Sequence, residues 1–182
     1  MLYIMRHGKT DWNELHKLQG RTDIPLNDEG RRMAGAVREE CRSIGFDICY
    51  SSPLRRALET ARIALEGLNV PIQTDERLME MSFGIYEGTE NSFAIPDCPI
   101  NVLFRDPAHY NAVEGGESLA ELYERTGSFL NEIVEPALRE GKNVLIVGHG
   151  AMNCSIVSRI RQTPVEAFWE VGIPNCKLIR LL

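Results

Sequence analysis

Two histidines in this sequence stand just after short apolar runs, where a side chain could take part in catalysis. Arg6 and His7 follow the run of residues 2–5, and His149 comes two residues after the run 143–147. If both runs are buried strands of a parallel sheet, their carboxyl ends meet at the edge where such sheets bind ligands. An imidazole can act as a nucleophile or carry a proton near neutral pH. The pattern therefore predicts one pocket that takes a small anion.

Glycines flank both histidines and would let a ligand approach the backbone closely. Gly8, Gly148 and Gly150 have no Cβ at these positions. The helix expected after Gly150 would also present free N–H groups at its positive end, which suits an anion. Gly150 is therefore a candidate phosphate-binding residue.

The elements that must position these residues alternate between strand and helix. Asn27 is placed to cap a long helix that Gly45 ends, and Ser52-Pro53 is typical of a helix start. The alternation predicts an α/β fold, a three-layer sandwich whose mostly parallel central sheet has helices on both faces. The expected strands are 2–5, 47–50, 71–74, 143–147 and 177–182, the expected helices are 28–43, 52–66, 117–139 and 151–160, and 6–26 is expected to be a loop.

Length and composition restrict the class of protein. With 182 residues, 43% of them hydrophobic, we expect residues 1–182 to form a single domain. The segment at about 89–116 is expected to be a loop-rich lid over the strand carboxyl ends. The net charge of −6 argues against broad binding to nucleic acid or to an anionic membrane. Five cysteines without a C-x-x-C pair, and no signal peptide or membrane span, predict a cytoplasmic protein.

Six sequence blocks, in order, resemble the histidine phosphatase superfamily, which is also called the phosphoglycerate mutase-like family. Among its members, phosphatases of the α-ribazole phosphatase and broad-specificity types look most similar. The blocks are R-H-G-K-T-D-W-N at 6–13, Q-G-R-T-D-I-P-L-N at 19–27, S-P-L-R-R-A-L-E-T-A at 52–61, L-M-E-M-S-F-G-I-Y-E-G at 78–88, G-G-E-S at 115–118 and V-G-H-G at 147–150.

The resemblance implies a mechanism and a set of catalytic residues. His7 matches the histidine that becomes a phosphohistidine, and a hydrogen bond from its other nitrogen, for example to the Gly8 carbonyl, must fix the tautomer. Glu80 matches the general acid that protonates the leaving group, with Glu87 as a competitor that we interpret as structural. His149 matches the second histidine, which in protonated form would neutralise the phosphoryl oxygens.

Further residues match phosphate-binding positions. Arg6 and Arg56 match the two arginines whose guanidinium forks bind phosphate, and Arg55 is expected to face solvent. Asn13 could donate to a phosphate oxygen. Specificity candidates around the lid are Arg21, Arg105, His109 and Tyr110, together with the aromatic residues Phe93 and Phe104. Lys9 replaces the Glu or Gln common at its position, and its role stays open.

The hypothesis is a metal-independent phosphomonoesterase that acts on a small phosphorylated metabolite without a cofactor. No sequence pattern for a metal site is present. The alternatives are a cofactor-dependent phosphoglycerate mutase and a non-catalytic phosphate-binding module. The chain's short length and its Q-G-R in place of T-G-W favour a phosphatase over a mutase. A monomer and a homodimer are both compatible with the sequence.

Overall fold

The short apolar runs of the sequence form a five-stranded sheet in the computed structural model, which describes residues 1–182. The strand order is β3-β2-β4-β1-β5, and β1 to β4 are parallel where they pair, while β5 runs antiparallel to β1. The predicted α/β class is confirmed. The strands are β1 (Leu2–Arg6), β2 (Ile48–Ser51), β3 (Ile72–Thr74), β4 (Val144–Gly148) and β5 (Ile179–Arg180).

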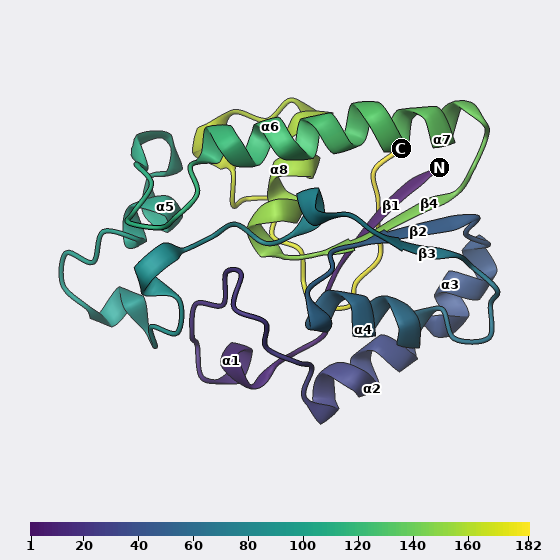
Figure 1. The fold of residues 1–182 in the computed structure, drawn as a ribbon, viewed down its shortest axis with the longest axis horizontal. Coiled ribbons are helices and arrows are strands. Elements are labelled where there is room, and N and C mark those ends of the chain that lie inside the picture. The colour runs from purple at the N-terminus through teal and green to yellow at the C-terminus, as the bar shows by residue number, and fades with distance from the viewer.

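Helices cover both faces of this sheet and make three layers (Figure 1). One face carries α2 (Asp28–Ala36), α3 (Arg38–Ile44) and α4 (Arg55–Ala64), and the other carries α6 (Leu119–Phe129), α7 (Glu135–Arg139) and α8 (Gly150–Arg161). Two short helices lie outside the layers, α1 (Asp11–Glu14) within the expected loop and α5 (Asn101–Arg105) within the expected lid. Single turns are η1 (Glu76–Leu78), η2 (Gly84–Tyr86), η3 (Ser92–Ala94), η4 (Pro107–His109) and η6 (Val165–Ala167), and a π-helical segment is η5 (Leu130–Val134).

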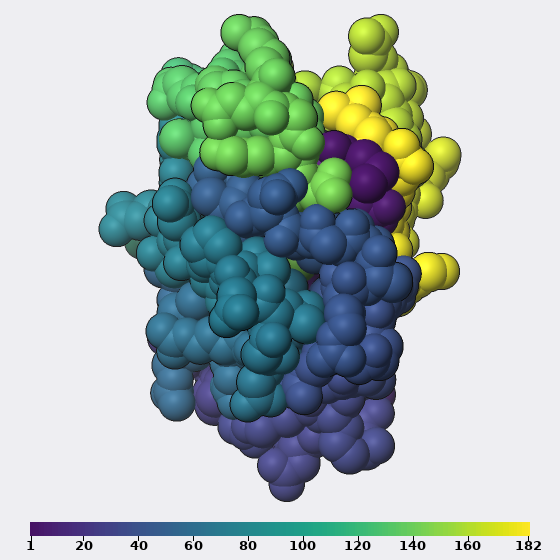
Figure 2. All heavy atoms as spheres, turned by 90° about the vertical axis from the view of Figure 1, so that its right-hand side faces the viewer, coloured from purple at the N-terminus to yellow at the C-terminus, as the bar shows by residue number.

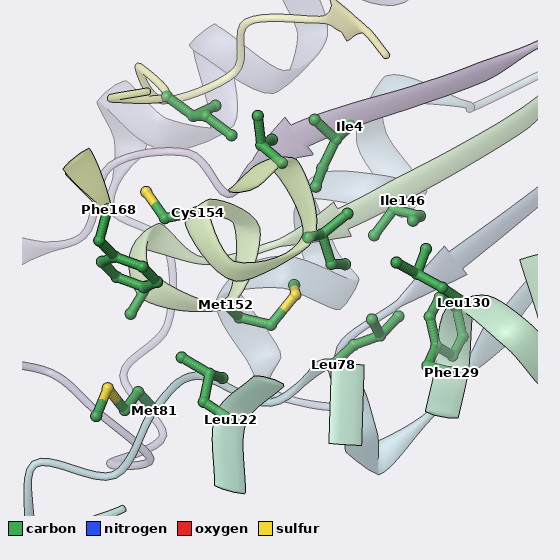
Figure 3. Close-up of a cluster of buried hydrophobic side chains, with 14 of the residues drawn as sticks. Ile4, Leu78, Met81, Leu122, Phe129, Leu130, Ile146, Met152, Cys154 and Phe168 are labelled. Carbon is green, nitrogen blue, oxygen red and sulfur yellow. The ribbon is translucent and has the colours of Figure 1, made fainter. Parts of the chain in front are cut away.

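Side chains of the central strands point alternately to the two faces of the sheet, and this divides the core into two clusters. Ile4 and Ile146 face α6 and α8 in a cluster of 26 buried residues, part of which is drawn in Figure 3. Met5 and Leu145, their neighbours in sequence, face α4 in a cluster of 11 buried residues. Successive side chains of a strand point to opposite faces, so a strand covered on both faces must be apolar throughout.

Three predicted helices are wrong in their extent. The helix expected at 28–43 is interrupted at Val37, whose ψ of −1° ends α2. The turn directs α3 so that Cys41 is buried and Arg38 donates to the carbonyl oxygen of Ile63 in α4, at 3.1 Å. The N-cap role of Asn27 is confirmed, because its side chain accepts a hydrogen bond from the backbone of Gly30.

The helix expected at 52–66 begins only at Arg55. The Ser52 hydroxyl accepts a hydrogen bond from the backbone N–H of Leu54 at 3.3 Å, so residues 52–54 form a turn before the helix. The N–H of Arg55 is satisfied by the Asp23 carboxylate, at 2.7 Å, from a distant loop. A tertiary contact thus replaces the local cap that the sequence indicates.

The helix expected at 117–139 begins at Leu119 and contains the π-helical turn of residues 130–134. Pro136 follows that turn; it has no N–H to donate, and its ring crowds the preceding turn of a regular helix. Ser118 and Glu121 form a capping box at the start. Glu117 is therefore not the first helical residue but turns inward, where its side chain pairs with Arg125.

The C-terminal strand is shorter than the expected 177–182 and pairs over two residues only. The two ends of the chain nonetheless lie together. The N–H of Leu2 donates to the carbonyl oxygen of Leu182 at 3.1 Å, and Figure 2 shows the purple N-terminal and yellow C-terminal residues side by side. Both termini are at the end of the molecule away from α5 and its loops (Figure 1). None of the helices has the length and apolar character needed to cross a membrane.

Candidate active site

The two histidines lie side by side because of the sheet register. Arg6 of β1 is the register partner of Gly148 of β4, so the next residues, His7 and His149, leave neighbouring strand ends together. Their ring centroids are 5.2 Å apart with an interplanar angle of 57°. Both side chains are buried, His7 at 2% exposure and His149 at 0%. The two imidazoles therefore lie together at the predicted edge of the sheet, and of the two only His7 borders the cavity there.

His7 is held in one tautomer. Its Nδ1 lies 2.7 Å from the carbonyl oxygen of Gly8. Because a carbonyl only accepts, Nδ1 carries the proton and Nε2 of the neutral ring keeps its lone pair. Burial, followed by the positive charges of Arg56 and Arg6, holds the pKa of His7 well below its ordinary value. The ring is thus neutral at pH 7, as a nucleophile must be.

Close backbone packing fixes the carbonyl that orients His7. The N–H of Gly8 donates to the hydroxyl of Thr60 in α4 at 3.0 Å. A Cβ at Gly8 would come within 2.5 Å of the carbonyl oxygen of Gly30. The Asn175 side chain donates to the carbonyl oxygen of His7 at 2.6 Å. Gly8 is therefore required at this position for its small size.

A cavity of about 270 Å³ opens at His7 and is bordered by most of the predicted site residues. They come from separate parts of the chain: the end of β1, the start of α4, the loop after η1 and the start of α8. These lining residues are Arg6, His7, Asn13, Arg56, Glu80 and Gly150. His149 does not border the cavity itself, but its ring lies against the ring of His7.

Two arginines make the cavity strongly positive. Arg56 is fully buried and donates from Nη2 to the carbonyl oxygen of Gly20 at 2.6 Å and from Nη1 to that of Thr22 at 2.8 Å. Burial lowers the pKa of Arg56 to about 10, so it stays charged at neutral pH. The Nε atoms of Arg6 and Arg56 are buried without a partner. Carboxylates near Arg56 offset part of the cost of burying its charge. A phosphate dianion in this cavity would add hydrogen-bond acceptors and negative charge for both arginines.

Glu80 occupies the N-terminus of α8. Its Oε1 accepts from the N–H groups of Met81 and Met152, each at 2.9 Å, and its Oε2 accepts from that of Ala151 at 3.2 Å. The free N–H groups that we expected to hold an anion after Gly150 are therefore partly occupied by this carboxylate. The helix end instead fixes Glu80 at the edge of the cavity.

Without a bound phosphate, His149 lies in surroundings that favour its uncharged form. Both of its ring nitrogens are buried without a hydrogen-bond partner. Burial, then the charge of Arg56, holds the pKa of His149 well below its ordinary value. A phosphate dianion beside the ring would oppose these effects and raise the pKa.

Asn13 borders the cavity while it caps α1. Its Oδ1 accepts from the backbone N–H of Thr10 at 3.0 Å, within a capping box. Only the Nδ2 group is then left to donate to a ligand, which suits an anion.

Glu87 is structural, as interpreted from the sequence. Its Oε1 accepts from the N–H of Arg21 at 2.9 Å, and its Oε2 accepts from the N–H of Thr22 at 2.8 Å. These bonds shape the loop whose carbonyl groups hold Arg56. Arg55 is exposed on α4, also as expected.

None of the four specificity candidates borders the cavity, and only Arg21 contacts Glu80. Its Nε donates to the backbone oxygen of Glu80 at 3.3 Å. Arg105, His109 and Tyr110 do not border the cavity. Arg105 lies over the ring of Phe93, His109 pairs with Asp106 on the surface, and the Tyr110 hydroxyl accepts from the N–H of Val113, so each is engaged elsewhere. Lys9 does not border the cavity either.

Sequence reasoning missed several residues of the cavity wall. Trp169 comes from a segment far along the chain, after α8, and packs on Phe104 with ring centroids 5.2 Å apart. Gln19 lines the cavity, and its Oε1 is buried without a partner. The adjacent pair Phe168-Trp169 in an otherwise polar stretch was the available signal.

Cys154 is not a second nucleophile, in agreement with its interpretation as helix core. Its sulfur lies in the apolar cluster of Figure 3, beside Met152 and Phe168. Burial raises the pKa of its thiol to about 12, so the thiolate is scarce at neutral pH. No group of three or more His, Cys, Asp or Glu side chains is arranged to hold a metal ion.

Two buried histidines at adjoining strand ends, with Arg6 at the end of β1 and Arg56 in α4, make a positively charged site that suits a phosphoryl group. Residues 2–182 match the model of the histidine phosphatase superfamily (branch 1), and the chain belongs to this family. The family prediction from the six sequence blocks is thereby confirmed.

Relatives of the chain include mutase-named and phosphatase-named proteins. The Probable phosphoglycerate mutase GpmB of Salmonella paratyphi B is 32% identical over 182 residues, which cover 99% of this chain and 83% of that protein. The solved structure of Bacillus stearothermophilus YhfR has a TM-score of 0.88 and 30% identity, covering 97% of this chain and 88% of that one. A mycobacterial glucosyl-3-phosphoglycerate phosphatase in complex with VO3 has a TM-score of 0.86 and 29% identity, covering 97% and 90%.

Proposed function

We propose that this protein is a metal-independent phosphomonoesterase that hydrolyses a small phosphorylated metabolite through a phosphohistidine on His7. The observation that carries the proposal is the hydrogen bond of 2.7 Å between Nδ1 of His7 and the Gly8 carbonyl. It leaves Nε2 as the free nucleophilic atom of a neutral ring. Arg6 and Arg56 border the same cavity and supply the positive charge that phosphoryl transfer needs.

The reaction would proceed in two displacements at phosphorus. In the first, Nε2 of His7 forms a bond to phosphorus while the bond from phosphorus to the ester oxygen breaks, and protonated Glu80 gives its proton to that oxygen. In the second, Glu80 takes a proton from water, whose oxygen attacks phosphorus and breaks the N–P bond. Inorganic phosphate leaves, and both His7 and Glu80 return to their starting states.

A phosphoglycerate mutase is the second candidate, because the relative GpmB carries that name. A mutase would return the phosphoryl group from His7 to a bound product instead of to water. A non-catalytic binding module is less well supported, since His7, Glu80 and both arginines are all present around one cavity.

Phosphate release from a panel of phosphomonoesters in excess EDTA tests the proposal, with His7→Ala measured alongside. We expect release by the wild type, unaffected by EDTA, and its loss in His7→Ala. Conversion of 3-phosphoglycerate to 2-phosphoglycerate with little free phosphate would instead identify a mutase. Binding of vanadate without turnover of any ester would identify a binding module.

A further inference from the structure

The cavity at His7 adjoins a second and larger cavity. The second one measures about 660 Å³, against about 270 Å³ for the first. Asn13, Lys17 and Leu18 border both, so the two cavities are direct neighbours. A phosphoryl group fills only part of the inner space, and the remaining volume is available to the leaving group of the substrate.

Aromatic rings form the wall that runs from one cavity to the other. Phe104 and Trp169 border the inner cavity, and Phe93 borders the outer one. The ring centroids of Phe93 and Phe104 are 5.6 Å apart, and those of Phe104 and Trp169 are 5.2 Å apart. We call these three rings the aromatic wall. Trp169 is fixed by a hydrogen bond from Nε1 to the carbonyl oxygen of Leu103 at 2.7 Å.

The outer end of the aromatic wall is open to a ligand. The Phe93 side chain is 54% exposed, an unusual state for a large apolar ring. Burial of an exposed ring against an apolar ligand releases water from both surfaces and is favourable. The wall therefore offers apolar surface at the place where the leaving group would lie.

The same space has little positive charge to offer. Lys17 is the one lysine or arginine that borders the outer cavity, and its Nζ lies 3.8 Å from a carboxylate oxygen of Glu90. Arg105 lies over Phe93, 5.3 Å from the ring centroid, and borders neither cavity. The only other basic side chain at the outer cavity is His16. A carboxylate or second phosphate on the leaving group would thus lose water and would have to compete with Glu90 for Lys17.

We propose that the leaving group of the substrate is an uncharged, ring-bearing or otherwise apolar alcohol that packs on the aromatic wall. This proposal rests on the proposed function and specifies its substrate class. A ring beside Phe93 and Phe104 buries apolar surface and gains the offset or edge-to-face contacts that aromatic pairs favour. Such phosphomonoesters should be preferred over phosphoglycerates, whose carboxylate would meet only His16 and a lysine already paired with Glu90.

Binding of two phosphonates tests the wall without any need for turnover. Benzylphosphonate and methylphosphonate share the anionic group, but only the first carries a ring. Titration calorimetry on the full chain is expected to give benzylphosphonate an affinity about tenfold higher or more. In Phe93→Ala this affinity ratio should fall several-fold. Ile95→Ala is the matched control, because Ile95 is an exposed apolar residue of the same segment that borders neither cavity.

Hydrolysis of 2-phenylethyl phosphate and ethyl phosphate separates this proposal from the one on which it rests. Both esters release a primary alcohol, so leaving-group chemistry is nearly matched, and we expect kcat/KM to be about tenfold higher or more for the first. Equal kcat/KM values together with equal phosphonate affinities would overturn the proposed role of the aromatic wall and leave the proposed phosphatase activity unaffected. Tighter benzylphosphonate binding without hydrolysis of either ester would support the wall and overturn the phosphatase.

Discussion

His7 and His149 face each other across neighbouring strand ends, with ring centroids 5.2 Å apart and both rings uncharged. The register of Arg6 with Gly148 produces this pairing, so the sheet itself positions the site. The two rings share a buried, positive environment but differ in one contact. His7 has an acceptor for its Nδ1 proton, whereas His149 has no partner at either nitrogen. This difference supports His7 as the nucleophile of the proposed mechanism and places His149 behind it, against the His7 ring.

Stability should fall with pH below about 6.5 because both histidines are held neutral. The pKa of each is lowered in the folded state, so the unfolded chain binds protons that the folded chain does not. The contribution of the two neutral histidines to folding stability is therefore present above the pKa that histidine has in the unfolded chain. It is lost as the pH falls below that value, at up to about 1.4 kcal/mol per pH unit for each ring.

Urea unfolding of the wild type and His149→Gln at pH 7 and pH 5.5 measures this effect. The loss of unfolding free energy between the two pH values should be smaller in His149→Gln by about 1 kcal/mol. The exposed His109, whose pKa is raised by Asp106, is present in both proteins, so its effect on the pH dependence is the same in both and drops out of the comparison. An identical pH dependence in the two proteins would show that His149 is not buried in its neutral form.

Glu80→Gln should reduce activity most strongly on esters with poor leaving groups. A glutamine cannot protonate the ester oxygen, so kcat/KM for an alkyl phosphate is expected to fall by about 10²–10⁴. The loss for 4-nitrophenyl phosphate, whose leaving oxygen needs little help, should be much smaller. Glu87→Gln is the control, because Glu87 holds the loop at Arg21 and Thr22 and should not alter the ratio between the two esters. Equal losses on both esters in Glu80→Gln would argue against its role as the acid.

Gly8→Ala should reduce both stability and turnover. A Cβ there would lie 2.5 Å from the backbone oxygen of Gly30, so the chain must shift and the Gly8 carbonyl would move away from His7. We expect a loss of about 2 kcal/mol or more in unfolding free energy. Gly35→Ala is the matched control, since its Cβ would meet only the Ile63 side chain at 3.9 Å and alanine favours the helix by up to about 1 kcal/mol. Similar effects of the two substitutions would contradict this account.

Glu117→Gln should destabilise the fold although Glu117 is remote from the reacting atoms. Its carboxylate pairs with Arg125 at 2.6 Å, and the two side chains are only 8% and 15% exposed. Loss of the Glu117 charge leaves Arg125 buried without its counter-charge, with only the Arg77 carbonyl oxygen as a further partner, and such a loss typically costs about 3 kcal/mol. The exposed pair of Glu135 and Arg139 gives the control, because Glu135→Gln should change the unfolding free energy by less than about 1 kcal/mol. Urea unfolding of both variants would reveal whether burial makes this difference.

The parts of the fold that depend on local pattern could be predicted from the sequence. The apolar runs of β1 and β4 indicate buried strands, and strand ends place His7 and His149 at one edge of the sheet. Arg56 and Glu80 were assigned by resemblance to the family, and the structure brings both to the same cavity.

What the sequence could not supply was long-range contact. The start of α4 is set by Asp23 from another loop, and no local signal reports that partner. The π-helical turn before Pro136 has the same apolar spacing as an ordinary helix, so its presence could not be predicted. Trp169 reaches the cavity by packing on Phe104 across the sequence, and such a contact leaves no periodicity.

The central claim, that His7 carries the phosphoryl group, is tested most directly by trapping the intermediate. Wild type and His7→Ala would be mixed with a hydrolysed ester, quenched within milliseconds in alkaline denaturant, which preserves the N–P bond, and examined by mass spectrometry. We predict a mass increase of one phosphoryl group, located on the peptide that contains His7, in the wild type and none in His7→Ala. A wild-type protein that turns over without any phosphoryl adduct, or with the adduct on His149, would contradict the mechanism.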